Sequence, residues 1–247
     1  MQDLRSIARC GGICGLLGTV IYVGLIVADQ WMPGSNAQTT AEFLAEAGKP
    51  ENRRWVMLPH LSVLAFAILW MVGMVALERV LTAQSEPARR DSPSGTRFGA
   101  AYFGKLLAIV GFALLTAMLI VQGAVMAGLG QMYVAAIGDA ERQNVVLLYR
   151  GLRSIDLGLD LAWDGLIFVA IVLMGWAMVR HPWFGRLLGS TGIAVGLGAL
   201  AANAWTAPTP PAFDWGPLCG LWIVAVNVRM LLLSRRNPGE TQGTAGT

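Results

Sequence analysis

Charged residues are scarce in this sequence. Asp, Glu, Lys and Arg make up 13% of the 247 residues, whereas an ordinary soluble domain carries about 25%. Lysine is almost absent, because only Lys49 and Lys105 occur among the 18 basic residues. A soluble protein of this size would expose more charge on its surface. The composition therefore argues against a soluble globular protein.

Histidine and cysteine are also few. The two histidines, His60 and His181, cannot supply a three-histidine zinc site. The predicted topology places them on opposite sides of a membrane, which excludes a haem held by two histidines of one chain. Three cysteines are an odd number and form no disulfide framework. No cofactor is expected, and the metal content of any site stays open.

Three features that would indicate a function class are missing. The chain has no glycine-rich phosphate-binding loop, which argues against an ATP-driven pump. It has no Gly-x-Ser-x-Gly elbow, which argues against a serine hydrolase. It has no basic stripe interleaved with aromatic residues, so nucleic acid is excluded as a partner.

Six apolar runs fill most of the chain, and hydrophobic residues make up 55% of it. The runs cover residues 10–28, 55–77, 106–128, 157–179, 187–205 and 215–233. The hydrocarbon core of a bilayer is about 30 Å thick, which about 20 helical residues span. The predicted fold is therefore all-α. It is a polytopic membrane bundle of six transmembrane helices in one domain, 1–234, followed by a disordered tail, 235–247.

Basic residues are unevenly divided between the two sides of the predicted bundle. With the amino terminus in the cytoplasm, 12 Lys and Arg residues are cytoplasmic and 6 are outside, while 5 acidic residues are cytoplasmic and 10 are outside. Cytoplasmic loops carry the excess of positive charge, so both termini are predicted to be cytoplasmic. The preference for Arg over Lys, with abundant Ala and Gly, suggests a bacterial gene. The predicted location is the bacterial cytoplasmic (inner) membrane, with the lipid bilayer as a partner.

The outer connections contain two further predicted helices. Thr39 and Glu42 have the spacing of a capping box and predict a short helix at the outer surface after the first span. Asp139 predicts the start of a helix that runs directly into the fourth span. The stretch before it is expected to be loosely helical because it contains three glycines: Gly128, Gly130 and Gly138.

Three aspartates lie four residues apart on the fourth span. Asp156, Asp160 and Asp164 therefore share one helix face. Asp164 lies roughly 10 Å inside the start of the span, and the span cannot be moved to exclude it. An ionised carboxylate that faces lipid at depth costs about 3 kcal/mol or more. The face must point into the bundle, where a proton, a cation or a basic partner offsets the repulsion among the carboxylates.

Other polar side chains are expected at a similar depth. His60, Gln122 and Asn203 lie in the outer halves of the second, third and fifth spans, whereas the inner halves are almost purely apolar. Arg153 precedes Asp156 by three residues on the same stripe. The predicted site is open to the outside and binds a small cation or a small polar ligand. Its residues are Asp160, Asp164, Asp156, Arg153, His60, Gln122 and Asn203.

The same residues also permit a structural interpretation. Asp156 would be solvated at the interface, Asp160 would pair with an arginine, and Asp164 would accept a hydrogen bond from Gln122 or Asn203. Three functions therefore stay open. The first is ligand binding for transport or sensing. The second is a membrane-embedded enzyme acting on a lipid or isoprenoid with paired carboxylates, and the third is a structural or regulatory subunit without its own ligand.

Glycines four residues apart mark helix-packing faces. These faces are expected to hold the bundle together, or to bind a second copy of the chain or another membrane protein. The pairs are Gly11 and Gly15, Gly185 and Gly189, and Gly192 and Gly196.

The short outer helix and the entry to the fourth span, from Arg150 through Arg153 to Asp164, give the chain a recognisable layout. This layout resembles that of six-helix integral membrane proteins of bacteria. The resemblance covers most of the chain and implies the six-helix fold, but it implies no site residue.

Overall fold

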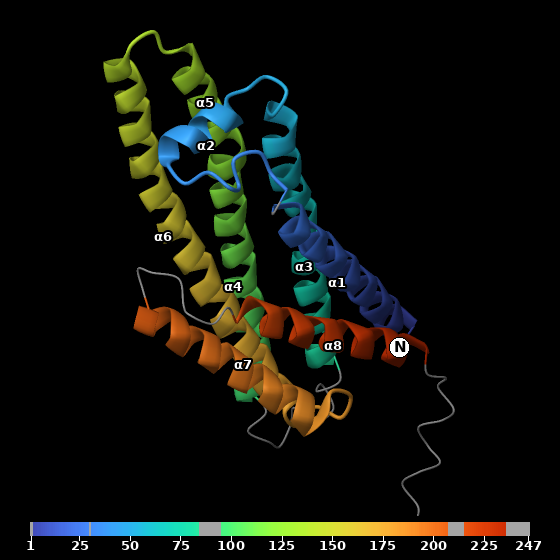
Figure 1. The fold of residues 1–247 in the computed structure, drawn as a ribbon. Coiled ribbons are helices and arrows are strands. Elements are labelled where there is room, and N and C mark those ends of the chain that lie inside the picture. The colour runs from blue at the N-terminus through green and yellow to red at the C-terminus, as the bar shows by residue number, and fades with distance from the viewer. Residues whose placement is uncertain (1, 30, 84–94, 207–214, 236–247) are drawn as a thin grey trace, which may run out of the picture. The chain divides into compact units, whose positions relative to one another are not determined.

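The computed structural model describes residues 2–29, 31–83, 95–206 and 215–235. All regular secondary structure in these ranges is helical (Figure 1), which confirms the all-α prediction. The elements in chain order are α1 (Gln2–Asp29), α2 (Thr40–Ala47), α3 (Arg53–Ala83), α4 (Gly95–Ile120), the π-helical turn η2 (Val121–Val125), α5 (Met126–Ala135), α6 (Asp139–Met178), α7 (Gly185–Thr206) and α8 (Gly216–Arg235).

Six helical segments of the described chain are long and apolar enough to cross a membrane, so the chain is compatible with a multi-pass integral membrane protein. Each contains one of the six predicted spans to within a residue. Which side of the membrane holds the termini stays a prediction. The segments are Asp3–Ala28, Arg53–Ala83, Gly99–Ala135, Asp139–Met178, Gly185–Trp205 and Gly216–Arg235.

The chain divides into two compact units. The first comprises Met1–Leu17, Trp70–Ala108 and Ile167–Thr247, and the second comprises Gly18–Leu69 and Ile109–Leu166. Helices α1, α3, α4 and α6 each contribute a segment to both units. The predicted single domain, 1–234, stays a prediction. Arg235, assigned above to the disordered tail, is the last residue of α8, and residues 236–247 lie outside the described residues.

In the first unit, glycines let helix backbones meet directly. A Cβ on Gly189 of α7 would lie 2.6 Å from the backbone nitrogen of Val179, and one on Gly175 of α6 would lie 2.7 Å from the carbonyl oxygen of Gly189. The indole of Trp222 on α8 fills the space beside Gly192 and donates a hydrogen bond of 2.9 Å to the Leu188 carbonyl. Gly189 and Gly192 of α7 are therefore occupied within this unit, whereas a Cβ on Gly185 would meet no atom within 4 Å.

The glycine face of α1 is occupied in the same way. A Cβ on Gly11 would overlap the side chain of Ala76 on α3, and one on Gly15 would overlap the side chain of Asn227 on α8. Asn227 is buried, and its amide donates a hydrogen bond of 2.9 Å to the Ile223 carbonyl of its own helix. Small residues thus allow close approach without a hydrophobic driving force between the helices.

Two helical segments that contribute to both units are far longer than a membrane span. The 40 residues of α6 extend about 60 Å, roughly twice the hydrocarbon thickness of a bilayer. The 37 residues of Gly99–Ala135 are helical throughout. The prediction that Asp139 begins a helix leading into the fourth span is confirmed. The expectation of a loosely helical stretch around Gly128 and Gly130 is wrong, because α5 is regular α-helix.

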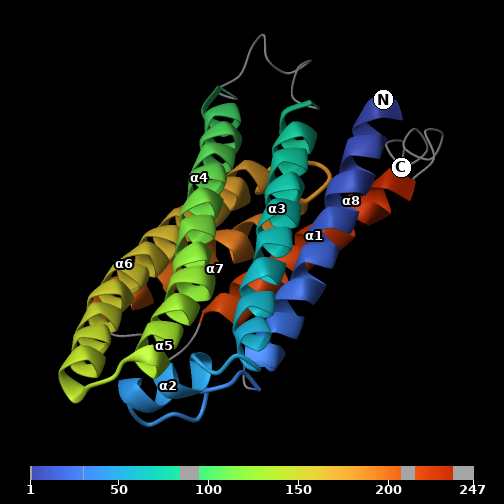
Figure 2. The same cartoon turned by 90° about the horizontal axis from the view of Figure 1, so that it is seen from above.

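In the second unit, helix α2 packs against α5 and lies beside it in both views (Figures 1 and 2). Its Leu44 is fully buried with three residues of α5 and α6: Leu129, Val145 and Val146. The capping prediction is confirmed, because the Thr39 hydroxyl accepts a hydrogen bond of 3.2 Å from the Glu42 backbone N–H. The Glu42 carboxylate accepts one of 2.9 Å from Gln38.

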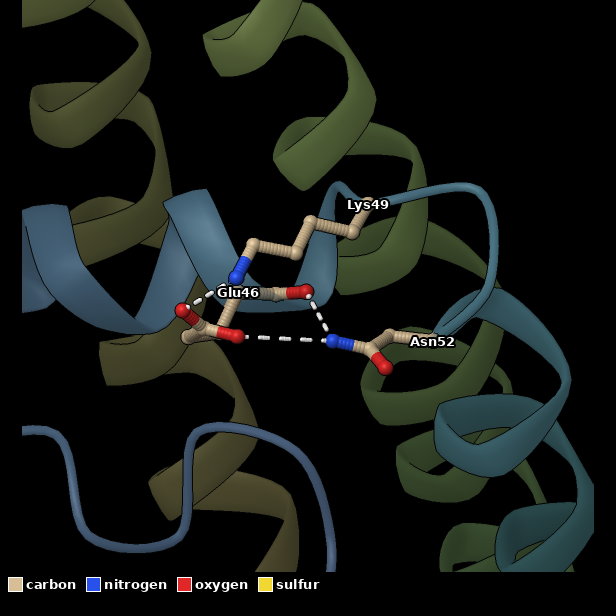
Figure 3. A network of polar contacts seen from close by, with 3 residues as sticks. All are labelled: Glu46, Lys49 and Asn52. Carbon is tan, nitrogen blue, oxygen red and sulfur yellow. Dashed lines mark hydrogen bonds and ion pairs between the residues drawn. The ribbon is translucent and has the colours of Figure 1, made fainter.

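The end of α2 is fixed by a glycine contact and a polar network. A Cβ on Gly130 of α5 would lie 2.7 Å from the backbone nitrogen of Gly48, which follows α2. Glu46 binds Lys49 through an ion pair of 2.6 Å and accepts a hydrogen bond of 2.9 Å at its carbonyl from Asn52 (Figure 3). These contacts hold the connection between α2 and α3 against α5.

Candidate functional site

The three aspartates of α6 all lie in the second unit but differ in burial. Asp156 is 1% exposed, whereas Asp160 and Asp164 are half-buried. Asp160 and Asp164 each interact with at least one neighbouring group. The interpretation of Asp156 as a solvated interface residue is therefore wrong. Asp156 is the most deeply buried of the predicted site residues in this unit.

Asp156 is bound from two sides through one oxygen. The Arg153 guanidinium forms an ion pair with Oδ2, and the Gln122 amide donates a hydrogen bond of 3.2 Å to the same oxygen. The other oxygen, Oδ1, is buried and has no hydrogen-bond partner among the described residues. Arg153 is 55% exposed, so the pair links the surface to a buried acceptor. A buried polar atom without a partner is uncommon in folded proteins.

Gln122 lies in η2, the π-helical turn between α4 and α5. A π-turn accommodates one extra residue in a helix, widens it locally and often occurs at functional sites. The contact of Gln122 on α6 is Asp156, whereas the structural interpretation above names Asp164 as its acceptor. The prediction that Gln122 belongs to the site gains a geometric basis from this turn.

His60 of α3 packs against the same π-turn. A Cβ on Gly123 would lie 2.9 Å from the Cβ of His60, so glycine is required for this approach. The imidazole Nδ1 lies 2.6 Å from the Val56 carbonyl oxygen, which can only accept. Nδ1 therefore carries the proton of this hydrogen bond. A cavity of about 70 Å³ lies beside His60 and is otherwise lined by apolar residues.

A layer of aromatic rings from four helices lies further along α3, α4 and α6. The rings of Tyr22 and Phe66 stack with centroids 4.8 Å apart, and Phe112 lies 6.5 Å from Phe66 and 6.1 Å from Trp163. These residues belong to α1, α3, α4 and α6. By helical rise, Phe66, Phe112 and Trp163 lie about 9–15 Å along the chain direction from His60, Gln122 and Asp156, respectively. The layer therefore lies to one side of His60, Gln122 and Asp156, whereas Asp164 directly follows Trp163 and lies at the level of the layer.

The structure thus brings together four of the seven predicted residues: Arg153, Asp156, Gln122 and, through Gly123, His60. Asp160 and Asp164 continue the same face of α6. Asn203 lies on α7 in the first unit, and its membership of the site stays a prediction.

Sequence reasoning missed a buried ion pair in the first unit. Glu78 of α3 is 6% exposed, and its Oε2 lies 3.1 Å from Nζ of Lys105 on α4. The ammonium group also lies 4.8 Å from the centroid of the Tyr102 ring. The signal was present in the sequence, because Glu78 ends one span and Lys105 begins the next, which places them at the same end of a helical hairpin.

His181 lies in the connection between α6 and α7. It is 6% exposed, and its Nδ1 accepts a hydrogen bond of 3.3 Å from the Trp183 backbone N–H. The proton of the neutral ring is therefore on Nε2, which has no partner among the described residues. Burial lowers the pKa of His181 to about 4, because the charged imidazolium is poorly solvated there.

We expect this histidine to make the protein less stable in acid. The unfolded chain binds a proton near pH 6.5 and the folded chain only near pH 4, so stability falls as pH drops between these values. The expected loss between pH 7.5 and pH 5 is about 2 kcal/mol, relative to a variant without this titration. His181→Asn retains the acceptor for Trp183 and is the matched comparison. Unfolding curves of equal pH dependence for the two proteins would contradict this expectation.

Within the described ranges, no group of three or more His, Cys, Asp and Glu side chains is placed to hold a metal ion. What the site of the second unit offers is a buried carboxylate oxygen, an exposed arginine and an amide. Comparison of the chain with protein-family models, with curated proteins and with solved structures found no match.

Proposed function

We propose that this membrane protein binds a small polar or cationic ligand at the aspartate face of α6, for transport or sensing. The ligand would donate hydrogen bonds to Asp156 and place positive charge near Asp160 and Asp164. Gln122 and His60 would complete its surroundings, with Arg153 at the opening.

The unpartnered Oδ1 of Asp156 carries this proposal. A buried carboxylate oxygen without a donor is costly, and a ligand with N–H or O–H groups would satisfy it. Arg153 already occupies Oδ2, so a hydrogen-bond donor suits the remaining oxygen better than a second bare cation. The π-turn at Gln122 provides independent support, because such turns are frequent at functional sites.

The other two hypotheses have less support. A metal-dependent enzyme would need a cluster of ligating side chains, and the described ranges contain no group of three or more His, Cys, Asp and Glu placed to hold a metal ion. The subunit hypothesis relied on glycine faces, and apart from Gly185 the glycines predicted to form those faces are occupied within the first unit.

The proposal is tested by thermal unfolding of the purified chain in detergent. The probes are ammonium ions, from methylammonium to tetramethylammonium, with sodium chloride at the same ionic strength as reference. A ligand that binds the folded state raises the unfolding free energy by about 2.7 kcal/mol at one hundred times its Kd. We expect a saturable increase with an ammonium ion that retains N–H groups.

Asp156→Asn and Asp164→Asn are expected to remove this increase. Asp139→Asn is the matched control, because it removes one exposed carboxylate from the same helix. An increase that is the same in all three variants would refute the proposed site. So would a series in which no ammonium ion exceeds sodium.

A further inference from the structure

An apolar groove lies where the carboxyl end of α1 meets the first turns of α3 in the second unit. Its volume is about 560 Å³, and its walls include Leu25, Ala28, Trp31, Trp55, Leu58 and Ser62. The Ser62 hydroxyl donates a hydrogen bond of 2.9 Å to the Leu58 carbonyl, so its polar group is used within the helix. The groove shares none of these residues with the aspartate face of α6.

A cationic pocket opens on the same first turn of α3. Its volume is about 480 Å³, and Arg53 and Arg54 line it together with Glu51. The arginines outnumber the acid, and no acidic side chain of the described residues lies within 4.0 Å of either arginine. The nearby Lys49 is already paired with Glu46. Two exposed guanidinium groups are therefore available to an anion.

The groove and the cationic pocket share no lining residue, but Arg54 of the pocket is followed in the chain by Trp55. This residue lines the groove, and the Cζ atom of Arg54 lies 5.7 Å from the centroid of its ring. Trp31 on the opposite wall is 83% exposed and Trp55 is 55% exposed. Tryptophans at the ends of membrane spans sit at the level of the lipid headgroups. A ligand that occupies both places must combine an anionic group with a long apolar chain.

We propose that this surface binds an anionic phospholipid. The phosphate would lie between Arg53 and Arg54, whose planar guanidinium groups suit bidentate contacts with phosphate oxygens. One acyl chain would lie in the groove along Leu25 and Leu58. A free phosphate would use only the arginines and a neutral lipid only the groove, so an anionic lipid is the one occupant that uses both.

The experiment uses quenching of tryptophan fluorescence in vesicles that contain the full chain. The vesicles are phosphatidylcholine with about one fifth brominated phosphatidylglycerol, and the mirror composition carries the bromine on phosphatidylcholine. We expect quenching by the brominated phosphatidylglycerol to exceed its mole fraction. Arg53→Gln with Arg54→Gln should weaken the preference roughly twenty-five-fold, at about fivefold for each cation. Trp31→Phe with Trp55→Phe should remove the excess quenching.

Arg142→Gln with Arg150→Gln is the matched control, because it removes two exposed arginines of α6 that lie outside the groove. This control should retain the preference. Ala28→Trp, which fills the groove and keeps both arginines, should reduce it, and an unchanged melting temperature in detergent confirms that each variant folds. Equal quenching by the two lipids, an equal loss in the control, or reversal of quenching by inorganic phosphate would each overturn the proposal.

Discussion

Replacing Gly130 with alanine is expected to lower the free energy of unfolding by about 3 kcal/mol, the upper part of the usual range for overpacking. The added Cβ would lie 2.7 Å from the backbone nitrogen of Gly48 and 3.0 Å from the carbonyl carbon of Ala47. Backbone atoms cannot rotate away as a side chain can. Helix α2 would therefore have to move as a whole, which would disrupt the packing of Leu44.

Gly128→Ala is the matched control for this prediction. Gly128 lies two residues away on the same helix, and a Cβ there meets no atom within 4 Å. Alanine is favoured over glycine in a helix by about 1 kcal/mol, so this variant should be slightly more stable than the parent protein. Unfolding by titration with a denaturing detergent measures both variants. Equal effects of the two substitutions would show that α2 does not rest on α5 through this contact.

Arg153→Ala is expected to cost about 3 kcal/mol, the lower end of the range for breaking a buried ion pair from one side. The substitution leaves the carboxylate of Asp156, which is 1% exposed, without its cation. The exposure of Arg153 lets water compensate in part, which is why the lower end of the range applies. Arg150→Ala should change stability by less than about 0.5 kcal/mol, because Arg150 is exposed on the same helix.

A double substitution separates the ion pair from other effects of removing Arg153. Replacing both Arg153 and Asp156 with apolar residues removes the buried charge together with its partner, which is often neutral for stability. Arg153→Ala with Asp156→Leu should therefore recover at least half of the loss caused by Arg153→Ala alone. If the two single effects simply add, the residues are not coupled and the pair contributes nothing measurable.

The membrane-spanning helices could be predicted from the sequence because each leaves a physical trace that needs no partner. A run of about 20 apolar residues must be helical in lipid, since every backbone polar group has to be satisfied internally. The spacing placed Arg153 and Asp156 on one helix face, although it did not single out Asp156 as the partner of the arginine. The start of α2 followed from the side-chain oxygen of Thr39, which supplies the missing acceptor at a helix terminus.

The features that could not be predicted depend on contacts between distant segments. Residues Val121–Val125 include a glycine and two valines, which weaken a helix but do not specify a π-turn. Gly130 was interpreted as a source of looseness, although its role is to admit the backbone of Gly48, which lies about eighty residues earlier in the chain. The burial of Asp156 was missed for the same reason. The burial of Asp156 depends on which side chains pack around it in the fold, and a hydropathy profile carries no information on such contacts.

The aromatic layer of the second unit has a consequence for the choice between carrier and receptor. A solute bound beside Asp156, as proposed above, would meet the rings of Phe66, Phe112 and Trp163 before the far half of the helices. A carrier would have to swing these rings aside once in every cycle, so its turnover would be limited by the rate of that rearrangement. A receptor needs no such motion, because release toward the side of entry completes its cycle.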